Sequence, residues 1–192
     1  SVPARTASAG RVTPALGLDD AGWAVFCRGV EAVSRAVGEA TGLPVGFHHH
    51  CAGYVETPDE IAALLRGTSP ELLGLVFDTG HYAFGAGDRD GGPTRAGLDR
   101  FAGRITHMHY KDCAPEVAAR AAAEGWDYFQ SVGNGVFCEL GKGCVDFPAT
   151  TEELRRRGYT GFITVEQDVL PGMGAPKESA RRNREYLKTL GL

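Results

Sequence analysis

The sequence contains no long apolar run and no excess of positive charge. Among its 192 residues, no stretch approaches the ~20 apolar residues of a membrane span. The first dozen residues lack the apolar centre of a signal peptide. The formal net charge of −4 leaves no global basic field for nucleic acid. We therefore expect a cytoplasmic protein with neither a membrane nor a nucleic-acid partner.

The five cysteines show no paired spacing. There is no CxxC motif and no zinc-finger spacing, and an odd number of cysteines argues against a disulfide framework. We expect reduced thiols at Cys27, Cys51, Cys113, Cys138 and Cys144. Hydrophobic residues make up 43% of the chain and charged residues 23%, so there is enough apolar material for a buried core.

What the sequence does contain is four short hydrophobic runs that end in potential metal ligands. They are PVGFHHH at 44–50, LVFDTGH at 75–81, ITHMHYKD at 105–112 and FITVEQD at 162–168, and all six histidines lie in the first three. The carboxyl ends of successive strands in a helix-wrapped parallel sheet face one crevice. A single strand-end histidine is more often a packing residue, but four such ends together predict one divalent-metal site.

Helical patterns alternate with these runs. The first helix is capped by Asp19 or Asp20 and ends at Gly42. It should lie on the sheet through an apolar stripe of Trp23, Phe26, Val30, Val33 and Val37. A capping box of Thr57 and Glu60 begins a helix that ends near Gly67. We also expect strands at 72–77 and 104–110, helices at 115–124, 152–157 and 181–190, and loops at 1–17 and 85–93.

Several phrases of the sequence carry a family resemblance. FHHHCAGYVET, FDTGH, ITHMHYKD, GKGCVDFP and ITVEQD occur in an order and spacing that resemble the C-terminal half of the xylose isomerase-like sugar isomerase and dehydratase barrels, most of all the inosose dehydratase branch. The resemblance covers roughly residues 18–190. It implies a (β/α)8 barrel of TIM type whose last four strands carry the metal ligands.

The length of the chain departs from a complete barrel. Such a barrel needs about 250 residues, whereas this chain shows only four strand and helix units. We therefore expect an α/β fold in a single domain, 1–192, that forms only the C-terminal half. Half a closed sheet leaves two unpaired edges and an uncovered interior. A truncated or separately encoded N-terminal half is favoured, since the chain starts at Ser1 without methionine. A complementing chain and homo-oligomerisation of two half-barrels are the alternatives.

The resemblance also implies a set of metal ligands. Three of them are Asp78, His109 and Glu166. Many relatives place a glutamate at the end of the first of these strands, where this chain has a histidine triplet, so the fourth ligand is open. Glu56 is narrowly favoured, with His48 and His50 nearer the substrate, although either histidine could ligate directly. Manganese and cobalt are favoured among the metals, and zinc and magnesium also suit such ligands.

The function implied is a metal-dependent dehydratase. This lyase would act on inosose (2-keto-myo-inositol) or a similar keto-polyol through a metal-stabilised enediolate. Its acid and base candidates are His81, His48 and His50, since imidazole titrates near neutrality. Lys111 could bind an oxyanion, or it could form a salt bridge to Asp112 or another carboxylate at the rim. The alternatives are a sugar isomerase or epimerase of the same superfamily, and a non-catalytic half-barrel that needs a complementing N-terminal half.

The segment between His109 and Glu166 is nearly twice as long as the other intervals between strand ends. Its excess contains Trp126, Tyr128 and Phe129. Extra length on the catalytic face is typical of a lid. A surface decoration is an equal alternative, and the aromatic residues could be ordinary packing.

Overall fold

The centre of the molecule is a parallel sheet of four strands. A computed structural model describes residues 2–192, so that Ser1 of the predicted N-terminal loop lies outside the described residues. The strand order is β1-β2-β3-β6, and every neighbouring pair is parallel. These strands are β1 (Val45–His48), β2 (Leu73–Asp78), β3 (Ile105–Tyr110) and β6 (Ile163–Val165). The predicted α/β architecture is confirmed. Three of the four hydrophobic runs contain one of these strands each, and the run at 75–81 overlaps β2, which begins two residues earlier.

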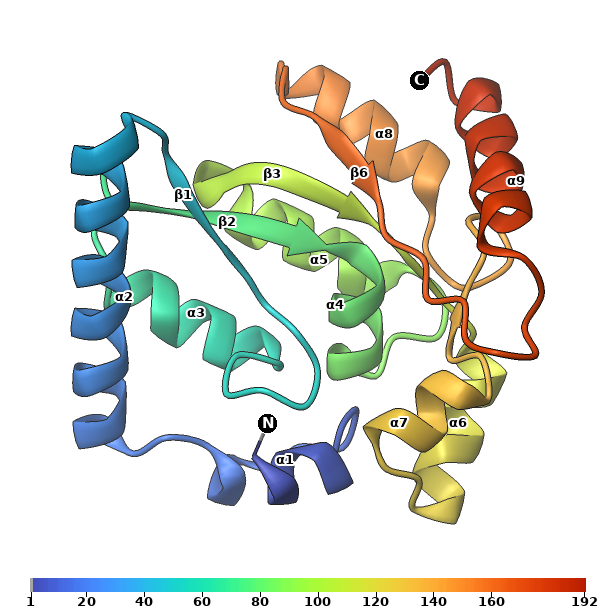
Figure 1. The fold of residues 1–192 in the computed structure, drawn as a ribbon, viewed down its shortest axis with the longest axis horizontal. Helices are drawn as coiled ribbons and strands as arrows, with labels where there is room; N and C mark the ends of the chain where they lie inside the picture. The colour runs from blue at the N-terminus through green and yellow to red at the C-terminus, as the bar shows by residue number, and fades with distance from the viewer. Residues whose placement is uncertain (1) are drawn as a thin grey trace.

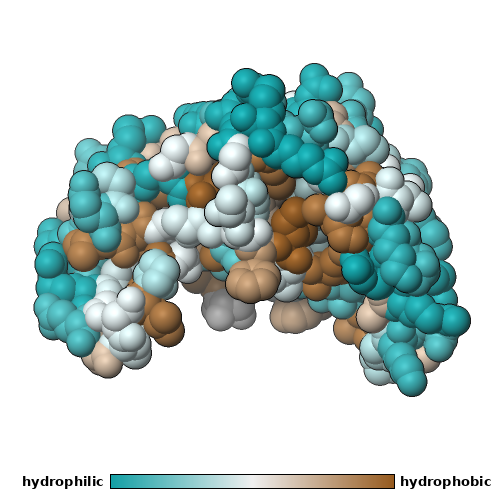
Figure 2. All heavy atoms as spheres, turned by 90° about the horizontal axis from the view of Figure 1, so that it is seen from above, coloured by the Kyte–Doolittle hydropathy of each residue, from teal (hydrophilic) through white to brown (hydrophobic). Residues whose placement is uncertain are grey.

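Helices surround the outer side of the sheet (Figure 1). The helices are α1 (Pro3–Ala7), α2 (Asp20–Thr41), α3 (Pro58–Arg66), α4 (Thr79–Ala86), α5 (Gly92–Phe101), α6 (Pro115–Glu124), α7 (Tyr128–Gly133), α8 (Phe147–Arg156) and α9 (Pro176–Thr189). Helix α2 lies beside the edge strand β1, and α8 and α9 lie near the other edge strand, β6. Seen from above, the molecule is an arch with a hollow on one side (Figure 2). A small antiparallel pair, β4 (Asp112–Cys113) and β5 (Phe137–Cys138), is formed by the chain between β3 and β6.

Strand β2 forms the middle of the core, as its continuous apolar run predicts. Leu75 and Phe77 have no exposed surface, and Ile61 and Leu64 of α3 are equally buried. All five cysteines are free thiols, as expected. Within the part of the chain that the structure describes, none of the helices combines the length and apolarity needed to cross a bilayer.

The helix ends follow the predicted capping chemistry. The Asp19 carboxylate accepts a hydrogen bond of 2.7 Å from the Gly22 N–H at the start of α2. Gly42 ends that helix with a left-handed φ of 69°, a conformation that costs glycine little. Thr57 and Glu60 form both halves of the capping box of α3. These local signals therefore fix where two of the helices begin.

The N-terminal segment is not the loop that its polar sequence predicted. It contains α1 and a 3₁₀ turn at Pro14–Leu16. Arg5 of α1 is fully buried and donates two hydrogen bonds, of 2.7 and 2.8 Å, to the Glu60 carboxylate. Its Nε donates to the Gly53 carbonyl at 2.7 Å. One arginine thus orders the segment against α3, a contact between residues far apart in sequence that local patterns do not reveal.

The glycine-rich stretch at 85–93 is also more ordered than predicted. Helix α4 continues to Ala86 and α5 begins at Gly92, so only a short turn remains between them. The buried carboxylate of Asp88 accepts hydrogen bonds from Gly91 N at 2.8 Å and from Thr94 N and Oγ1 at 2.8 and 2.7 Å. Helices α8 and α9 likewise begin several residues earlier than predicted, at Phe147 after its cap Asp146 and at Pro176.

The apolar stripe of α2 is only partly covered. Phe26 packs edge-on against Phe47 of β1, with ring centroids 5.9 Å apart. Val33, however, is 60% exposed, so the prediction that the whole stripe lies on the sheet is wrong. Val25, which lies outside the stripe, is 62% exposed. Together with residues of β1, these side chains line an open apolar groove of about 470 Å³. No described residue covers this groove.

Candidate metal centre

The four parallel strands bring one side chain each to a common point at their carboxyl ends. Asp78 pairs with His109 across β2 and β3, and His109 pairs with Thr164 of β6. Glu166, just beyond β6, donates its N–H to the Tyr110 carbonyl at 3.0 Å, which keeps it in line with the sheet. One ligand atom from each of four residues lies within 4.8 Å of the others: His48, Asp78, His109 and Glu166. We call these four residues the ligand cluster.

The distances inside the ligand cluster are those of a preassembled site. His109 Nδ1 lies 2.8 Å from Glu166 Oε2 and 3.6 Å from Asp78 Oδ2. His48 Nε2 lies 3.5 Å from the same Asp78 oxygen and 3.8 Å from Glu166 Oε2. Two imidazole nitrogens and two carboxylate oxygens aimed at one point are a donor set that suits a divalent first-row metal. The residues present therefore fit such an ion.

Asp78 presents only Oδ2 to the ligand cluster, because its Oδ1 is hydrogen-bonded to the backbone. It is the N-cap of α4, and its Oδ1 accepts the His81 N–H at 2.7 Å. Burial raises the pKa of Asp78, but the surrounding imidazoles, His81 first, outweigh burial and hold that pKa below its usual range. The hydrogen bond from His109 likewise lowers the pKa of Glu166. Both carboxylates are thus ionised at neutral pH, as ligands must be.

The pKa of His109 is raised, in contrast to those of the two carboxylates. Hydrogen bonds to Asp78 and Glu166 raise its pKa to about 9. In the absence of a cation, His109 is therefore protonated at neutral pH and balances part of the negative charge of the two carboxylates. A bound metal would take the place of this proton.

The structure does not bring Glu56 into the ligand cluster. Its carboxylate accepts hydrogen bonds from Gly10 N at 2.6 Å and from Ala52 N at 2.7 Å, and burial raises its pKa to about 7. The chain turns sharply at Ala52, where φ is 69°, and this turn carries Glu56 away from the strand ends. Glu56, which was expected to be the fourth ligand, therefore lies outside the ligand cluster, and His48 lies inside it.

The histidine triplet separates into three environments. His48 belongs to the ligand cluster, and His49 is fully buried behind Asp78. His50 faces the site side like His48: its Nε2 lies 3.4 Å from the Tyr128 hydroxyl, and its ring centroid lies 3.8 Å from that of His81. Its Nδ1 donates to the Cys51 carbonyl at 2.6 Å, so Nε2 is left as the acceptor. Burial lowers the pKa of His50 to about 4.

His81 is fully buried with an unused nitrogen. Its Nδ1 accepts from the Cys51 N–H at 3.5 Å, which leaves the proton on Nε2. That Nε2 has no hydrogen-bond partner among residues 2–192 and lies 3.7 Å from Glu166 Oε1. Burial lowers the pKa of His81 despite the nearby Asp78 carboxylate. A buried N–H without a partner beside the ligand cluster is a donor available to a ligand.

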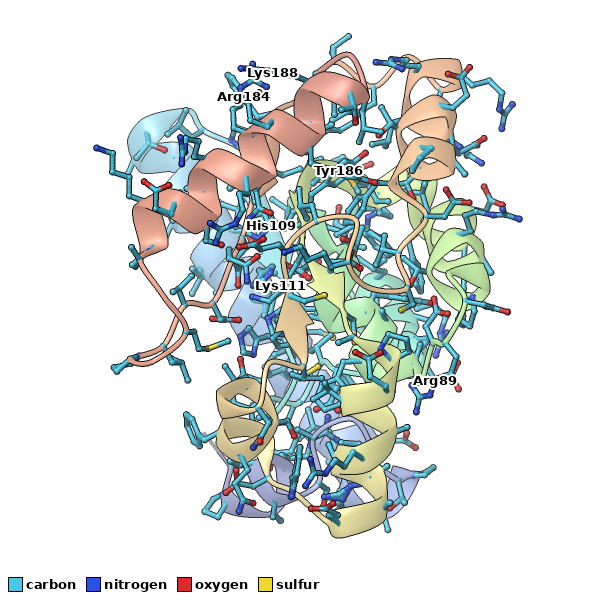
Figure 3. All side chains as sticks on the ribbon, turned by 90° about the vertical axis from the view of Figure 1, so that its right-hand side faces the viewer. Arg89, His109, Lys111, Arg184, Tyr186 and Lys188 are labelled. Carbon is cyan, nitrogen blue, oxygen red and sulfur yellow. The ribbon has the colours of Figure 1, made fainter. Side chains whose placement is uncertain are left out.

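Lys111 is almost fully buried at the same edge. Figure 3 shows it near His109 in the middle of the molecule, whereas Arg184 and Lys188 lie on the outside of α9. Its Nζ lies 2.8 Å from Glu166 Oε1 and 2.7 Å from Asp168 Oδ2. Burial opposes the charge, but these carboxylates and Asp78 outweigh it and raise the pKa of Lys111. Of the two carboxylates that hold Lys111, Asp168 was not singled out from the sequence, although it ends the VEQD phrase.

The contacts of Gly80 and Asp112, two neighbours of Lys111, account for the glycines in the DTGH and GKGCV phrases. Gly80 packs so closely that a Cβ there would lie 2.7 Å from Lys111 Cγ and 3.0 Å from its carbonyl carbon. Asp112, considered as a partner of Lys111, instead accepts hydrogen bonds from the N–H groups of Gly141, Gly143 and Val145. The GKGCV phrase is thus a loop folded around one buried carboxylate.

Of the three aromatic residues in the long segment before Glu166, only Tyr128 reaches the site, through its hydroxyl at His50. Phe129 is 65% exposed, and the Trp126 ring stacks on the Arg120 guanidinium at 5.0 Å. Helix α7 therefore contributes one wall of the site through a single side chain.

Comparison with known proteins gives a consistent family and fold. A profile of the family described as xylose isomerase-like TIM barrel matches residues 5–190. The chain is 34% identical over 170 residues to inosose dehydratase of Bacillus velezensis. The aligned region covers 88% of this chain and 55% of the relative. The chain is also 37% identical over 166 residues to the rhizopine catabolism protein MocC of Rhizobium meliloti, covering 86% of this chain and 49% of that protein. The chain thus spans about half the length of these curated relatives.

A solved structure confirms the fold alone. The probable 3-DHS dehydratase AsbF of Bacillus anthracis superposes with a TM-score of 0.66 at 15% sequence identity. The superposition covers 89% of this chain and 58% of AsbF.

Proposed function

Because the chain belongs to the xylose isomerase-like TIM barrel family, we propose that it carries the metal-binding half of an enzyme that dehydrates inosose or a similar keto-polyol. The observation that carries this proposal is the ligand cluster of two imidazoles and two carboxylates at four adjacent strand ends. The similarity to inosose dehydratases over most of the chain supports the choice of substrate class.

The ligand cluster would hold one divalent ion through His48, Asp78, His109 and Glu166. Manganese or cobalt is favoured, and zinc or magnesium also suits mixed nitrogen and oxygen donors. When bound, the ion would polarise a substrate carbonyl oxygen and make the neighbouring C–H bond more acidic.

The surrounding residues supply groups for proton transfer. His50 presents an unprotonated Nε2, because its Nδ1 proton is committed to the Cys51 carbonyl, and it is our candidate for the base that removes the proton next to the carbonyl. His81 presents an Nε2–H without a partner among residues 2–192, and it is our candidate for a hydrogen bond to the departing hydroxyl. Lys111, held by Glu166 and Asp168, places a fixed positive charge where a substrate oxygen gains negative charge.

The four-stranded sheet corresponds in this proposal to half of an eight-stranded barrel. Strands β1 and β6 are the edges of the sheet, and the groove beside α2 and β1 is apolar and open. Eight strands close a barrel of this type. Full activity accordingly requires a second half that covers these edges, whether on the same chain, a separate chain or a second copy.

The test begins with metal binding. Purified protein reconstituted with Mn²⁺ or Co²⁺ should retain about one equivalent after desalting, and Asp78→Ala should lose it, whereas Glu56→Gln should keep it. Metal-loaded protein, assembled with the second half that full activity requires, should then convert inosose into an unsaturated diketone that absorbs in the ultraviolet. Absence of metal from the reconstituted wild-type protein would refute the proposal.

The product also separates the proposed reaction from its main alternative. A sugar isomerase or epimerase of the same superfamily would use the same ligand cluster and return the proton to another face or carbon of the substrate, without loss of water. New sugars without ultraviolet absorption would identify that reaction. Bound metal without turnover would instead indicate a non-catalytic half-barrel that lacks its complement.

A further inference from the structure

The middle residue of the histidine triplet has a contact that its neighbours lack. The β1 and β2 ladder ends with His48 paired to Val76. Asp78 lies two residues beyond Val76, where the chain after β1 is turning away from the sheet. There the Asp78 N–H donates to His49 Nε2 at 3.2 Å. The imidazole of His49 thus satisfies a backbone group at a point where regular strand pairing has stopped.

This contact completes the constraints on Asp78. Its N–H is held by His49, and its Oδ1 accepts the His81 N–H. With the backbone and one oxygen fixed, the carboxylate can turn only Oδ2 toward His48 and His109. A ligand held in this way does not have to be ordered when an ion binds.

The surroundings of His49 argue against a simple packing role. The side chain has no exposed surface and packs against the rings of Phe77 and Tyr82, with centroids 5.7 and 6.0 Å away. Because Nε2 is the acceptor, the proton of the neutral ring is on Nδ1, and Nδ1 has no hydrogen-bond partner among residues 2–192. An apolar side chain would fill the same space without an unsatisfied donor. Only the bond to Asp78 gives imidazole an advantage here.

We propose that His49 is a positioning residue, which holds Asp78 in the orientation that the ligand cluster requires without touching the ion itself. This inference rests on the proposed metal site and adds to it a residue behind the ligands. It assigns different tasks to three adjacent and identical side chains.

The experiment compares two substitutions at His49 with a packing control. His49→Gln keeps an acceptor that can reach the Asp78 N–H, and His49→Phe keeps the bulk but removes the acceptor. Tyr82→Leu removes packing from the same imidazole and leaves the hydrogen bond in place. Calorimetric titration with Mn²⁺ or Co²⁺ should give an affinity about 10- to 100-fold weaker for His49→Phe. His49→Gln and Tyr82→Leu should both stay within about threefold of wild type.

A second measurement does not depend on metal. Amide hydrogen exchange of metal-free protein should show Asp78 protected in the wild type and in His49→Gln, and at least about tenfold faster in His49→Phe. Equal affinity in His49→Phe and wild type, or equal losses in both His49 variants, would overturn the positioning role. If the wild type binds no metal, the proposed function fails, and unchanged Asp78 exchange in His49→Phe would show separately that His49 does not hold it.

Discussion

The proton on His109 leads to the most direct quantitative prediction about the ligand cluster. Its imidazole lies between two carboxylates, which raise its pKa to about 9. A metal ligand must be deprotonated, so binding an ion has to expel this proton. At pH 7 only about one molecule in a hundred has a neutral His109, which weakens the apparent metal affinity about 100-fold relative to pH above 9.

The sign of the pH dependence follows from this competition. Affinity should rise about tenfold for each pH unit between 7 and 8.5, and should level off as the pH approaches 9. Calorimetry of Co²⁺ binding at pH 7, repeated in buffers of different ionisation enthalpy, should report about one proton released per ion. His107→Phe serves as the control, because His107 bonds to Thr164 at 2.9 Å and does not contact the two carboxylates. Its proton count should be unchanged.

A proton count near zero at pH 7, or an affinity that is flat from pH 7 to 8.5, would refute this reasoning. It would mean that His109 is already neutral between the carboxylates, or that the ion binds without displacing it.

Three further predictions concern the protein without metal. Raising the pH from 6.5 to 9 should reduce the free energy of unfolding by about 1–3 kcal/mol. The raised pKa of His109 stabilises the fold fully below pH 6.5, and this stabilisation is lost as the pH rises through 9. A urea midpoint that stays constant over this range would contradict the prediction. Gly80→Ala should lower the free energy of unfolding, measured with urea, by about 1–3 kcal/mol, because the new Cβ clashes with Lys111. Gly29→Ala should not lower it, because a Cβ there meets nothing within 4 Å. Arg5→Ala should lower the free energy of unfolding by about 3 kcal/mol, because it removes the buried partner of Glu60. Arg100→Ala, which breaks an exposed ion pair, should lower it by less than about 1 kcal/mol. Equal losses in the two variants would show that Arg5 does not order the N-terminal segment.

Much of the site could be predicted from the sequence because parallel strands impose a simple rule. Their carboxyl ends meet at one edge, so residues that follow hydrophobic runs converge. The structure brings Asp78, His109 and Glu166 together in this way. The helix caps at Asp19 and Thr57 were equally accessible, because capping depends on residues three positions apart.

The errors came from contacts between segments that are distant in sequence. Glu56 is an acidic residue close to a strand end, and nothing local distinguishes a ligand from a carboxylate that caps two backbone N–H groups. Its partners are the N–H groups of Gly10 and Ala52, and the first of these belongs to a segment expected to be a loop. The same segment is ordered by Arg5, whose partner Glu60 was recognised only as a capping residue.

The histidine triplet marks the limit of what a sequence pattern can decide. Strand alternation predicts positions 48 and 50 on one side and 49 on the other. Although β1 ends at His48, the rings of His48 and His50 both contact His81, whereas His49 packs against Phe77 and Tyr82. Alternation cannot say which of the two site-side histidines joins the ligand cluster, because that depends on where β1 stops pairing with β2. The ladder ends at His48, which stays in line with the other strand ends. His50 lies past the bend and reaches Tyr128 instead, while the bend directs His49 to the backbone of Asp78. The end of one short strand therefore gives three identical side chains three different environments.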